Sequence, residues 1–124
     1  LARDFGATEV VAPGADVSGV DAFVDCSGVP AAVLGGLPAV RPGGAAVLVG
    51  MGADEMTLPV SMLQSREITL TGTFRYANTW PTAVRLAASG AVDLGRLVTG
   101  HVDLDHVGDA LSPDASQVKV VVRP

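Results

Sequence analysis

The run Val49-Gly50-Met51-Gly52, which ends a strongly apolar segment, is a first place where chemistry could occur. Glycine has no side chain, so a ligand can approach the backbone there. The backbone N–H and C=O groups could then hold a carboxamide. The same glycines could simply end a strand, and by themselves these residues favour that simpler role.

A second candidate is the run Thr73-Phe74-Arg75-Tyr76. Arg75 offers several N–H donors and Tyr76 a hydroxyl, and both suit a hydroxyl-rich ligand. The backbone of Thr73 and Phe74 could contact the edge of a ring. The alternative is a surface Arg–Tyr pair that covers apolar area, which is the commoner role of such a pair taken alone.

The other reactive residue types predict structure rather than catalysis. Cys26 is the only cysteine, which excludes a disulfide framework and a four-cysteine zinc site, and we expect its thiol to be buried as a small apolar group. The spacing of His101 and His106 is not that of a recognised zinc site. An acidic stretch lacks the pattern of a calcium loop and is expected to be solvated: Asp103, Asp105, Asp109 and Asp114. We predict no catalytic residue and no metal ligand in this chain.

Composition narrows the class of protein. With 48% hydrophobic and 17% charged residues, the 124-residue chain can bury a core. A net charge of −5 argues against a nucleic-acid partner. No apolar run approaches the roughly 20 residues of a membrane span. A single thiol fits a reducing, cytoplasmic compartment. We therefore expect a small-molecule ligand, and neither nucleic acid nor a membrane as partner.

Short apolar runs alternate with helix-like segments, which predicts an α/β fold with a mainly parallel sheet. The expected strands are residues 9–12, 21–26, 45–49, 67–74 and 118–122. The run at 45–49 is apolar throughout, as expected of a strand covered on both faces. Arg41-Pro42-Gly43-Gly44 predicts a turn before it, and residues 56–60 predict a small extended piece.

Helices are expected between these strands, at residues 31–40, 61–66 and 80–89. Pro30 suits the first turn of the first helix, although Gly35 and Gly36 weaken it, so that tertiary packing must support it. Thr79 could cap the third helix, in which we expect Trp80 to be a packing residue.

Three stretches, each after an expected strand, together resemble one family: Cys26-Ser27-Gly28, Val49-Gly50-Met51-Gly52 and the run from Gly72 to Pro81. The chain resembles the zinc-dependent medium-chain dehydrogenases, and within them the sorbitol (L-iditol) dehydrogenase branch. The Phe-Arg-Tyr-Ala-Asn-Thr-Trp-Pro part of the third stretch is specific to that branch. The resemblance covers essentially the whole chain.

The resemblance implies a Rossmann-type, doubly wound parallel sheet of order 3-2-1-4-5-6, of which this chain holds strands 3 to 6. The strand at Val10 would be the third, and those at Phe23, Val47 and Leu70 the fourth to sixth. It also implies a partial nucleotide-binding domain over residues 1–111. Residues 112–124 would form a C-terminal segment whose strand belongs to the catalytic domain.

The resemblance further implies the site. NAD or NADP would be contacted by Val49, Gly50, Met51, Thr73, Phe74 and Arg75, and a polyol or related alcohol by Arg75 and Tyr76. Zinc, its ligands and the Gly-x-Gly-x-x-Gly fingerprint would lie outside this chain. We therefore expect a C-terminal fragment of a dehydrogenase that transfers hydride from a polyol to NAD(P). By itself the fragment would be catalytically inactive.

Alternatives stay open. One is another medium-chain branch, such as an alcohol or threonine dehydrogenase or a quinone reductase. Another is a noncatalytic binding module on the same fold. Two features depart from the polyol branch: Gly100 stands where relatives often have a histidine, and residues 110–117 are irregular. In the sheet that the resemblance implies, strand 1 lies beside strand 4 and would be missing from this chain. The edge of the fourth strand would then be exposed, and we therefore expect a homo-oligomer.

Overall fold

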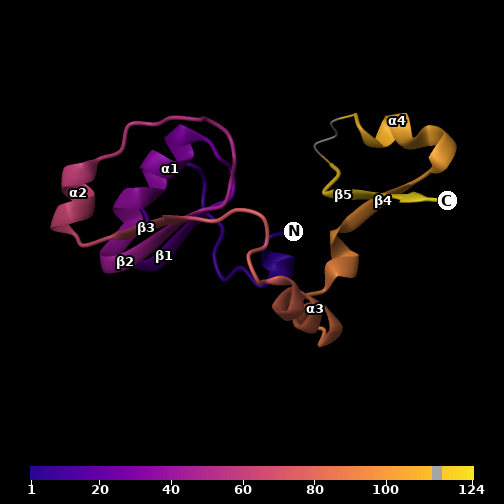
Figure 1. Cartoon of the computed structure of the whole chain (residues 1–124), viewed down its shortest axis with the longest axis horizontal. Helices are drawn as coiled ribbons and strands as arrows, with labels where there is room; N and C mark the ends of the chain where they lie inside the picture. The colour runs from indigo at the N-terminus through magenta and orange to yellow at the C-terminus, as the bar shows by residue number, and fades with distance from the viewer. Residues whose placement is uncertain (113–115) are drawn as a thin grey trace. The chain divides into compact units, whose positions relative to one another are not determined.

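The computed structural model describes residues 1–112 and 116–124, and the chain divides into two compact units, Leu1–Arg75 and Tyr76–Pro124 (Figure 1). Among these residues the first unit carries a three-stranded sheet and the second a two-stranded one. The division predicted at residue 111 refers to the domains of a whole enzyme and stays a prediction.

The first unit is built on a parallel sheet. Its strands, in spatial order, are β1 (Val20–Asp25), β2 (Val40–Leu48) and β3 (Thr69–Gly72). The helical segments between them are α1 (Pro30–Gly36), the 3-10 turn η2 (Leu37–Ala39) and α2 (Val60–Ser65). The α/β fold is thus confirmed, with β1, β2 and β3 where the fourth, fifth and sixth strands were expected.

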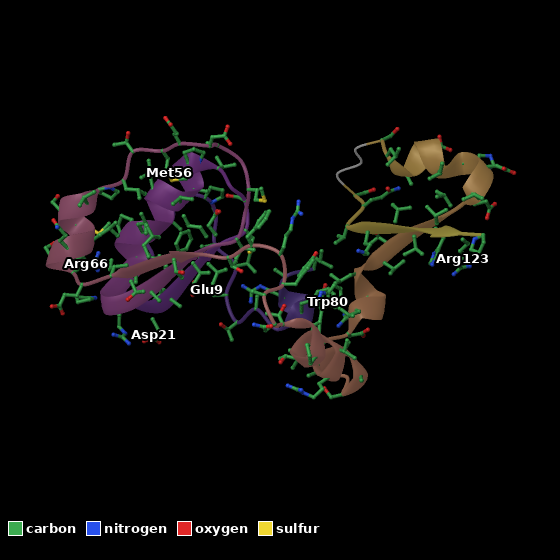
Figure 2. All side chains as sticks on the ribbon, in the orientation of Figure 1. Glu9, Asp21, Met56, Arg66, Trp80 and Arg123 are labelled. Atoms are coloured by element: carbon green, nitrogen blue, oxygen red, sulfur yellow. The ribbon has the colours of Figure 1, made fainter. Side chains whose placement is uncertain are left out.

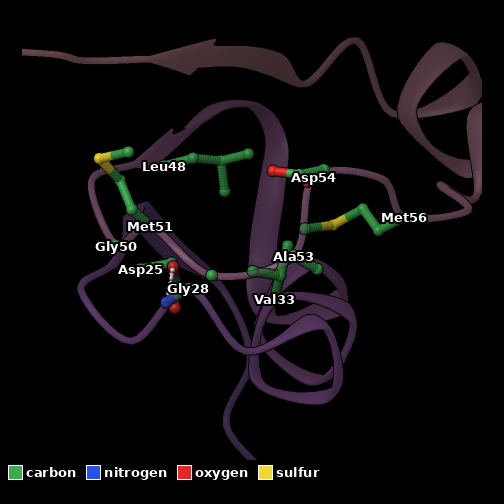
Figure 3. Close-up of a pocket in the computed structure, with 10 residues that line it drawn as sticks. Asp25, Gly28, Val33, Leu48, Gly50, Met51, Ala53, Asp54 and Met56 are labelled. Carbon is green, nitrogen blue, oxygen red and sulfur yellow. Dashed lines mark hydrogen bonds between the residues drawn. The ribbon is translucent and has the colours of Figure 1, made fainter.

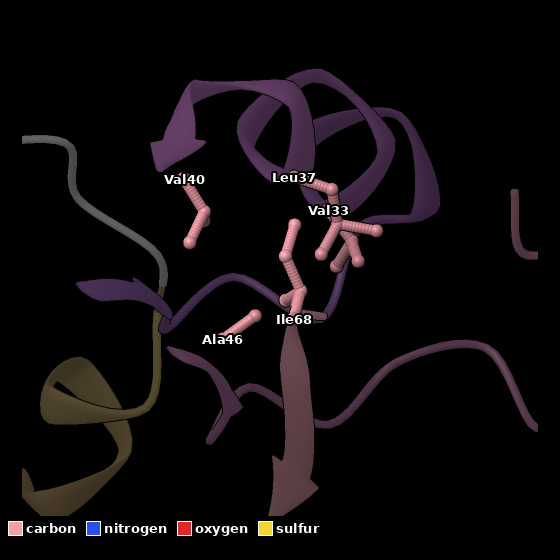
Figure 4. Close-up of a cluster of buried hydrophobic side chains, with 5 residues drawn as sticks. All are labelled: Val33, Leu37, Val40, Ala46 and Ile68. Carbon is pink, nitrogen blue, oxygen red and sulfur yellow. The ribbon is translucent and has the colours of Figure 1, made fainter. Parts of the chain in front are cut away.

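The hydrophobic core lies between this sheet and its helices (Figure 4). Phe23, Ala46 and Leu70 pair in one row across the three strands, so their side chains share one face. The fully or nearly fully buried members of the core are Val33, Leu37, Val40, Ala46 and Ile68. Met62 and Leu63 of α2 also pack against the cluster, so both helices cover the same face of the sheet.

The opposite face of the sheet is less covered. Ala45 and Val47 of β2 are only partly buried, and Val24 of β1 is 52% exposed. The expectation that this apolar strand is covered on both faces is therefore wrong for the residues described, because α1 and α2 both pack on the other face.

Helix α1 contains the glycines that weaken it, and one of them has a packing role. A Cβ on Gly36 would overlap the ring of Phe23, whereas one on Gly35 would meet nothing within 4 Å. The aromatic ring thus packs directly on the helix backbone. This contact supports a helix that propensity alone would not.

Two local expectations for the first unit are wrong, and a third is corrected at its last residue. Residues 9–12 form no strand, because the sheet offers them no neighbouring strand: β1 pairs with β2 alone among the residues described. The predicted turn at residues 41–44 lies inside β2, whose register with β1 shifts at this point and accommodates the two glycines. The small extended piece expected at residues 56–60 is shorter, because Val60 already begins α2, and Met56 and Leu58 pack against the core.

The first residues of the chain form a 3-10 turn, η1 (Arg3–Phe5). It ends at Gly6, whose φ of 95° is left-handed and whose N–H donates to the carbonyl of Arg3 at 3.0 Å. Glycine adopts this conformation without steric cost, which explains the stop.

The second unit begins with α3 (Trp80–Ala88) and continues through η3 (Leu94–Leu97), β4 (Val98–Asp103), η4 (Leu104–His106), α4 (Val107–Ala110) and β5 (Lys119–Arg123). Thr79 precedes α3 as predicted but makes no side-chain capping hydrogen bond. Asp103, Asp105 and Asp109 are exposed, as expected, while Asp114 lies outside the described residues.

The tail strand β5 has a partner that was not predicted. It pairs in parallel with β4, with Gly100 opposite Val120 and His101 opposite Val121. The Thr99 hydroxyl accepts a hydrogen bond from the N–H of Val118 at 2.8 Å, next to this pairing. Gly100, the departure from the polyol branch, is therefore a strand residue. The assignment of the tail to a catalytic domain stays a prediction.

Across residues 1–112 and 116–124, every helix is too short or too polar to span a bilayer.

Candidate functional site

A pocket of about 360 Å³ opens where β1 and β2 end (Figure 3). Parallel strands present their carboxyl ends at one edge of the sheet, which is where open α/β sheets bind ligands. Asp25, Leu48 and Gly72 form the last paired row of the three strands. The residues that line the pocket are Asp25, Gly28, Val33, Leu48, Gly50, Met51, Gly52, Ala53, Asp54 and Met56.

Asp25 is the buried acid of this pocket, with only 4% of its surface exposed. Its Oδ1 accepts hydrogen bonds from the Ser27 hydroxyl at 2.6 Å and the Ser27 N–H at 3.1 Å. Its Oδ2 accepts one from the Gly28 N–H at 2.9 Å. The carboxylate thus satisfies the turn that follows its own strand.

These hydrogen bonds stabilise the charged form of the carboxylate. The Ser27 hydroxyl and then the Gly28 N–H lower the pKa of Asp25 below its ordinary value, against an opposing effect of burial. Asp25 is therefore ionised at neutral pH and acts as a hydrogen-bond acceptor rather than as an acid.

The ends of β1 and β2 touch through glycines. A Cβ on Gly28 would lie 2.6 Å from the Met51 carbonyl oxygen, and a Cβ on Gly50 would lie 2.6 Å from the backbone nitrogen of Ser27. A Cβ on Gly52 would overlap the carbonyl of Gly28. Gly28 also has a φ of +68°, which disfavours any side chain. A residue with a side chain would not fit at any of these three positions unless the opposite backbone moved.

The predicted residues Val49, Gly50 and Met51 all lie at this strand end. The N–H groups of Val49 and Gly50 donate to the carbonyl of Asp25 at 2.8 and 3.0 Å. Among the described residues, Met51 and Gly52 make no backbone hydrogen bond, and Met51 is 76% exposed. Their backbone groups are therefore free to hydrogen-bond to a ligand, and their role as cofactor contacts stays a prediction. Val49 does not line the pocket and is 43% exposed.

Thr73 follows β3 and is tied to the same sheet edge, because its N–H donates to the carbonyl of Leu48 at 3.0 Å. Phe74 is 58% exposed, and the Arg75 guanidinium stacks on its ring at 4.8 Å from the ring centre. Arg75 has a φ of 46°, an uncommon left-handed conformation for a residue with a side chain. None of these three lines the pocket.

Tyr76 begins the second compact unit. Its ring lies 5.1 Å from that of Trp80 at an angle of 54°, and both residues are more than half exposed. Trp80 was expected to be a packing residue, but it is 61% exposed, and its aromatic neighbour is Tyr76. No residue of α3 is buried, so the helix offers Trp80 no core to pack into.

Cys26 corrects another expectation. Its thiol is exposed, not buried. Side chains alternate across a strand, and Asp25 takes the inward position at the end of β1, so the next residue points away.

The described residues do not form a cluster of metal ligands. No three His, Cys, Asp or Glu side chains among them come together in a way that could hold a metal ion. His101 and His106 lie in β4 and η4 of the second unit, and the structure gives them no ligand role.

Sequence analysis missed several residues of the pocket. Asp25 is the most informative, because an acidic residue followed by Ser-Gly at a strand end is a signal for side-chain capping of the turn. Asp54 and Met56 were also missed, since a loop that folds back over the sheet leaves no periodic pattern.

Comparison with known proteins identifies the family. The family model described as zinc-binding dehydrogenase matches residues 1–89. L-arabinitol 4-dehydrogenase of Penicillium rubens is 36% identical over 114 residues, which cover 85% of this chain and 30% of that protein. Sorbitol dehydrogenase of Macaca fascicularis is 39% identical over 87 residues, which cover 70% of this chain and 24% of that protein.

A solved structure from Sinorhizobium meliloti 1021, described as a zinc-binding dehydrogenase bound to NADP, superposes with a TM-score of 0.78 at 28% identity. The match covers 86% of this chain and 32% of that one. This chain thus spans about a third or less of the length of each of these relatives. The family-model match at residues 1–89 includes β1, β2, β3 and the pocket at their ends. On the family-model match, the sequence relatives and the shared fold, the chain belongs to the zinc-binding dehydrogenase family.

Proposed function

We propose that this chain is the nicotinamide-facing part of a zinc-dependent polyol dehydrogenase, which transfers hydride from a sugar alcohol or related secondary alcohol to NAD or NADP. The observation that carries the proposal is the pocket at the ends of β1 and β2, with the open backbone of Met51 and Gly52 on its wall. The relatives named for arabinitol and sorbitol support a polyol as substrate.

The cofactor would be held by backbone groups rather than by charge. We assign this role to the strand-end residues Val49, Gly50, Met51, Thr73, Phe74 and Arg75. The pocket itself is lined by Asp25 and Asp54 and by no Lys, Arg or His. Such a lining favours the uncharged or cationic nicotinamide end of a dinucleotide over its phosphates. When bound, the nicotinamide supplies a hydride acceptor.

Arg75 and Tyr76 would contact the polyol. Arg75 keeps N–H donors for neutral hydroxyl oxygens while its planar face rests on Phe74. The Tyr76 hydroxyl can both donate and accept. Their exposure suits groups that meet a polar substrate, and the left-handed backbone at both residues is the kind of local strain that clusters at functional sites.

The residues described do not fit a zinc ion, so no catalytic step is assigned to zinc on this chain. We also propose that the isolated chain does not oxidise polyols. Its sequence contains no Gly-x-Gly-x-x-Gly run to hold a pyrophosphate. Purified chain mixed with NAD and sorbitol should give no NADH absorbance above the buffer control, and measurable reduction would contradict this.

An NMR titration with NADH tests the assigned cofactor contacts. NADH should shift the amide signals of Met51, Gly52 and Thr73, with a dissociation constant of about 1 mM or weaker because only part of the cofactor is contacted. Signals of β4 and β5 serve as the internal control. Shifts confined to residues away from the ends of β1, β2 and β3 would contradict the proposed site.

Two further features of the protein are proposed with this function. Self-association is supported by β1, an edge strand among the described residues with Val24 exposed, beside an apolar groove lined by Val11, Val17 and Ala22. Sedimentation should show a dimer or larger species, and a clean monomer would count against self-association.

A cytoplasmic location is supported by the single, exposed, unpaired Cys26.

A further inference from the structure

Asp25 lies at a junction between two strand ends. Its backbone carbonyl accepts the N–H groups of Val49 and Gly50 at 2.8 and 3.0 Å. Its carboxylate accepts three hydrogen bonds from Ser27 and Gly28. One residue thus binds both the end of β2 and the turn after β1.

The turn at Ser27 and Gly28 lies directly on residues 50–52. Only glycine backbone separates the two segments, since a Cβ at Gly28, Gly50 or Gly52 would overlap the opposite backbone. With no flexible side chain between them, a displacement of the turn is transmitted to residues 50–52 rather than absorbed.

We propose that Asp25 is a positioning residue of the dinucleotide site, whose carboxylate fixes the turn at Ser27 and Gly28 and, through direct backbone contact, the open backbone of Met51 and Gly52. This inference rests on the proposed function. Asp25 does not itself contact the reacting atoms; it acts through the turn.

An ionised carboxylate is required for this role. Every one of its three partners is a donor, so only a group that accepts on both oxygens satisfies them all. Hydrogen bonding from Ser27 and Gly28 lowers the pKa of Asp25, which keeps it ionised. Asp54 is the other charged group that lines the pocket, and the nearest ion pair on β1, Asp21 with Arg41, lies at the other end of the strand.

The test uses the 124-residue chain and three variants. Asp25→Asn keeps the shape but turns an –NH2 group toward the Gly28 N–H. Ser27→Ala removes the hydroxyl donor and leaves both N–H donors in place. Asp21→Asn is the matched control, because it removes the same charge from an exposed residue of the same strand (Figure 2).

Amide NMR provides the structural readout. On acidification of the wild-type chain, the amides of Ser27, Gly28, Met51 and Gly52 should shift with one shared midpoint, below the ordinary pKa of an aspartate. Asp25→Asn should abolish that midpoint and speed hydrogen exchange at Gly28 by about tenfold or more. Asp21→Asn should change neither. If the amides of Ser27 and Gly28 shift while those of Met51 and Gly52 do not, Asp25 holds only its own turn and the inference is wrong.

NADH affinity provides the functional readout, followed through the same amides. Asp25→Asn should weaken binding about tenfold, Ser27→Ala by less, and Asp21→Asn not at all. Absence of any NADH effect on the wild-type chain would contradict the proposed function, whereas the shared acid midpoint would still decide the positioning role. If Asp25→Asn fails to fold, the wild-type pH titration and Ser27→Ala decide it.

Discussion

Gly50→Ala should destabilise the first unit, although it adds a single methyl group. The new Cβ would lie 2.6 Å from the backbone nitrogen and carbonyl carbon of Ser27, and closer still to the nitrogen of Gly28. Optimal contact distances are roughly 3.5–4.0 Å, so the turn must move by about 1 Å. Overpacking of this kind costs about 1–3 kcal/mol, and the strained hydrogen bonds to Asp25 add about 1 kcal/mol. We therefore expect a loss of about 2–4 kcal/mol.

The assay is urea unfolding, monitored through the amide NMR signals of Val33 and Leu37, two buried residues of the first unit. Signals specific to that unit are needed because a chain with two compact units need not unfold in one step. The matched control is Gly35→Ala. That glycine is helical, has open space around it and should gain about 0.5–1 kcal/mol.

The result that would refute the reasoning is a Gly50→Ala chain as stable as the wild type, within about 0.5 kcal/mol, with unchanged amide shifts at Ser27 and Gly28. The two backbones would then not be in direct contact, and neither the pocket wall nor the positioning role of Asp25 would follow.

Three other changes have defined outcomes. Leu37→Ala removes a fully buried core side chain and should cost about 2–5 kcal/mol in urea unfolding; a loss below 1 kcal/mol would mean that the core is not packed as described. Gly36→Ala should act opposite to its neighbour Gly35→Ala, costing about 1–3 kcal/mol because the methyl group meets the ring of Phe23, and an equal gain from both variants would argue against that contact. Hydrogen bonds from Ser27 and Gly28 lower the folded-state pKa of Asp25, so its contribution to stability is fully present above the ordinary pKa of an aspartate and is lost as the pH falls through the folded-state value. Unfolding measured from pH 6 down to pH 2 should show that loss in the wild type and less of it in Asp25→Asn, and identical pH profiles would rule it out.

Local sequence patterns were sufficient to predict the sheet of the first unit. Apolar runs bounded by Gly and Pro predicted β1, β2 and β3 to within a few residues, apart from the start of β2, and Pro30 marked the start of α1. These signals are local, since strand alternation and turn chemistry depend on neighbours in the sequence. Of the predicted cofactor contacts in the glycine-ended run, Gly50 and Met51 line the pocket and Val49 does not; their role in cofactor binding stays a prediction.

The acid at the centre of the site could not be found in the same way. The Ser-Gly that follows Asp25 is a sequence signal that its side chain caps the turn, but no residue near it in the sequence indicates that the side chain is buried at the pocket. Its position follows from the pairing row with Leu48 and Gly72, which sets the face toward the helices, and from the donors that the turn supplies. Cys26 was misjudged for the same reason, because its exposure depends on which neighbour takes the inward position.

The sequence pattern by itself thus determined the α/β class and the glycine-rich strand end, and the family resemblance implied the order of β1, β2 and β3. Tertiary structure decided the cases in which a strand-like pattern and strand pairing disagree. Residues 9–12 look like a strand but find no partner in the sheet, whereas residues 98–103 form β4 because β5 lies beside them. A strand is stabilised by hydrogen bonds to another segment, and the position of that segment is not encoded in the strand's own residues.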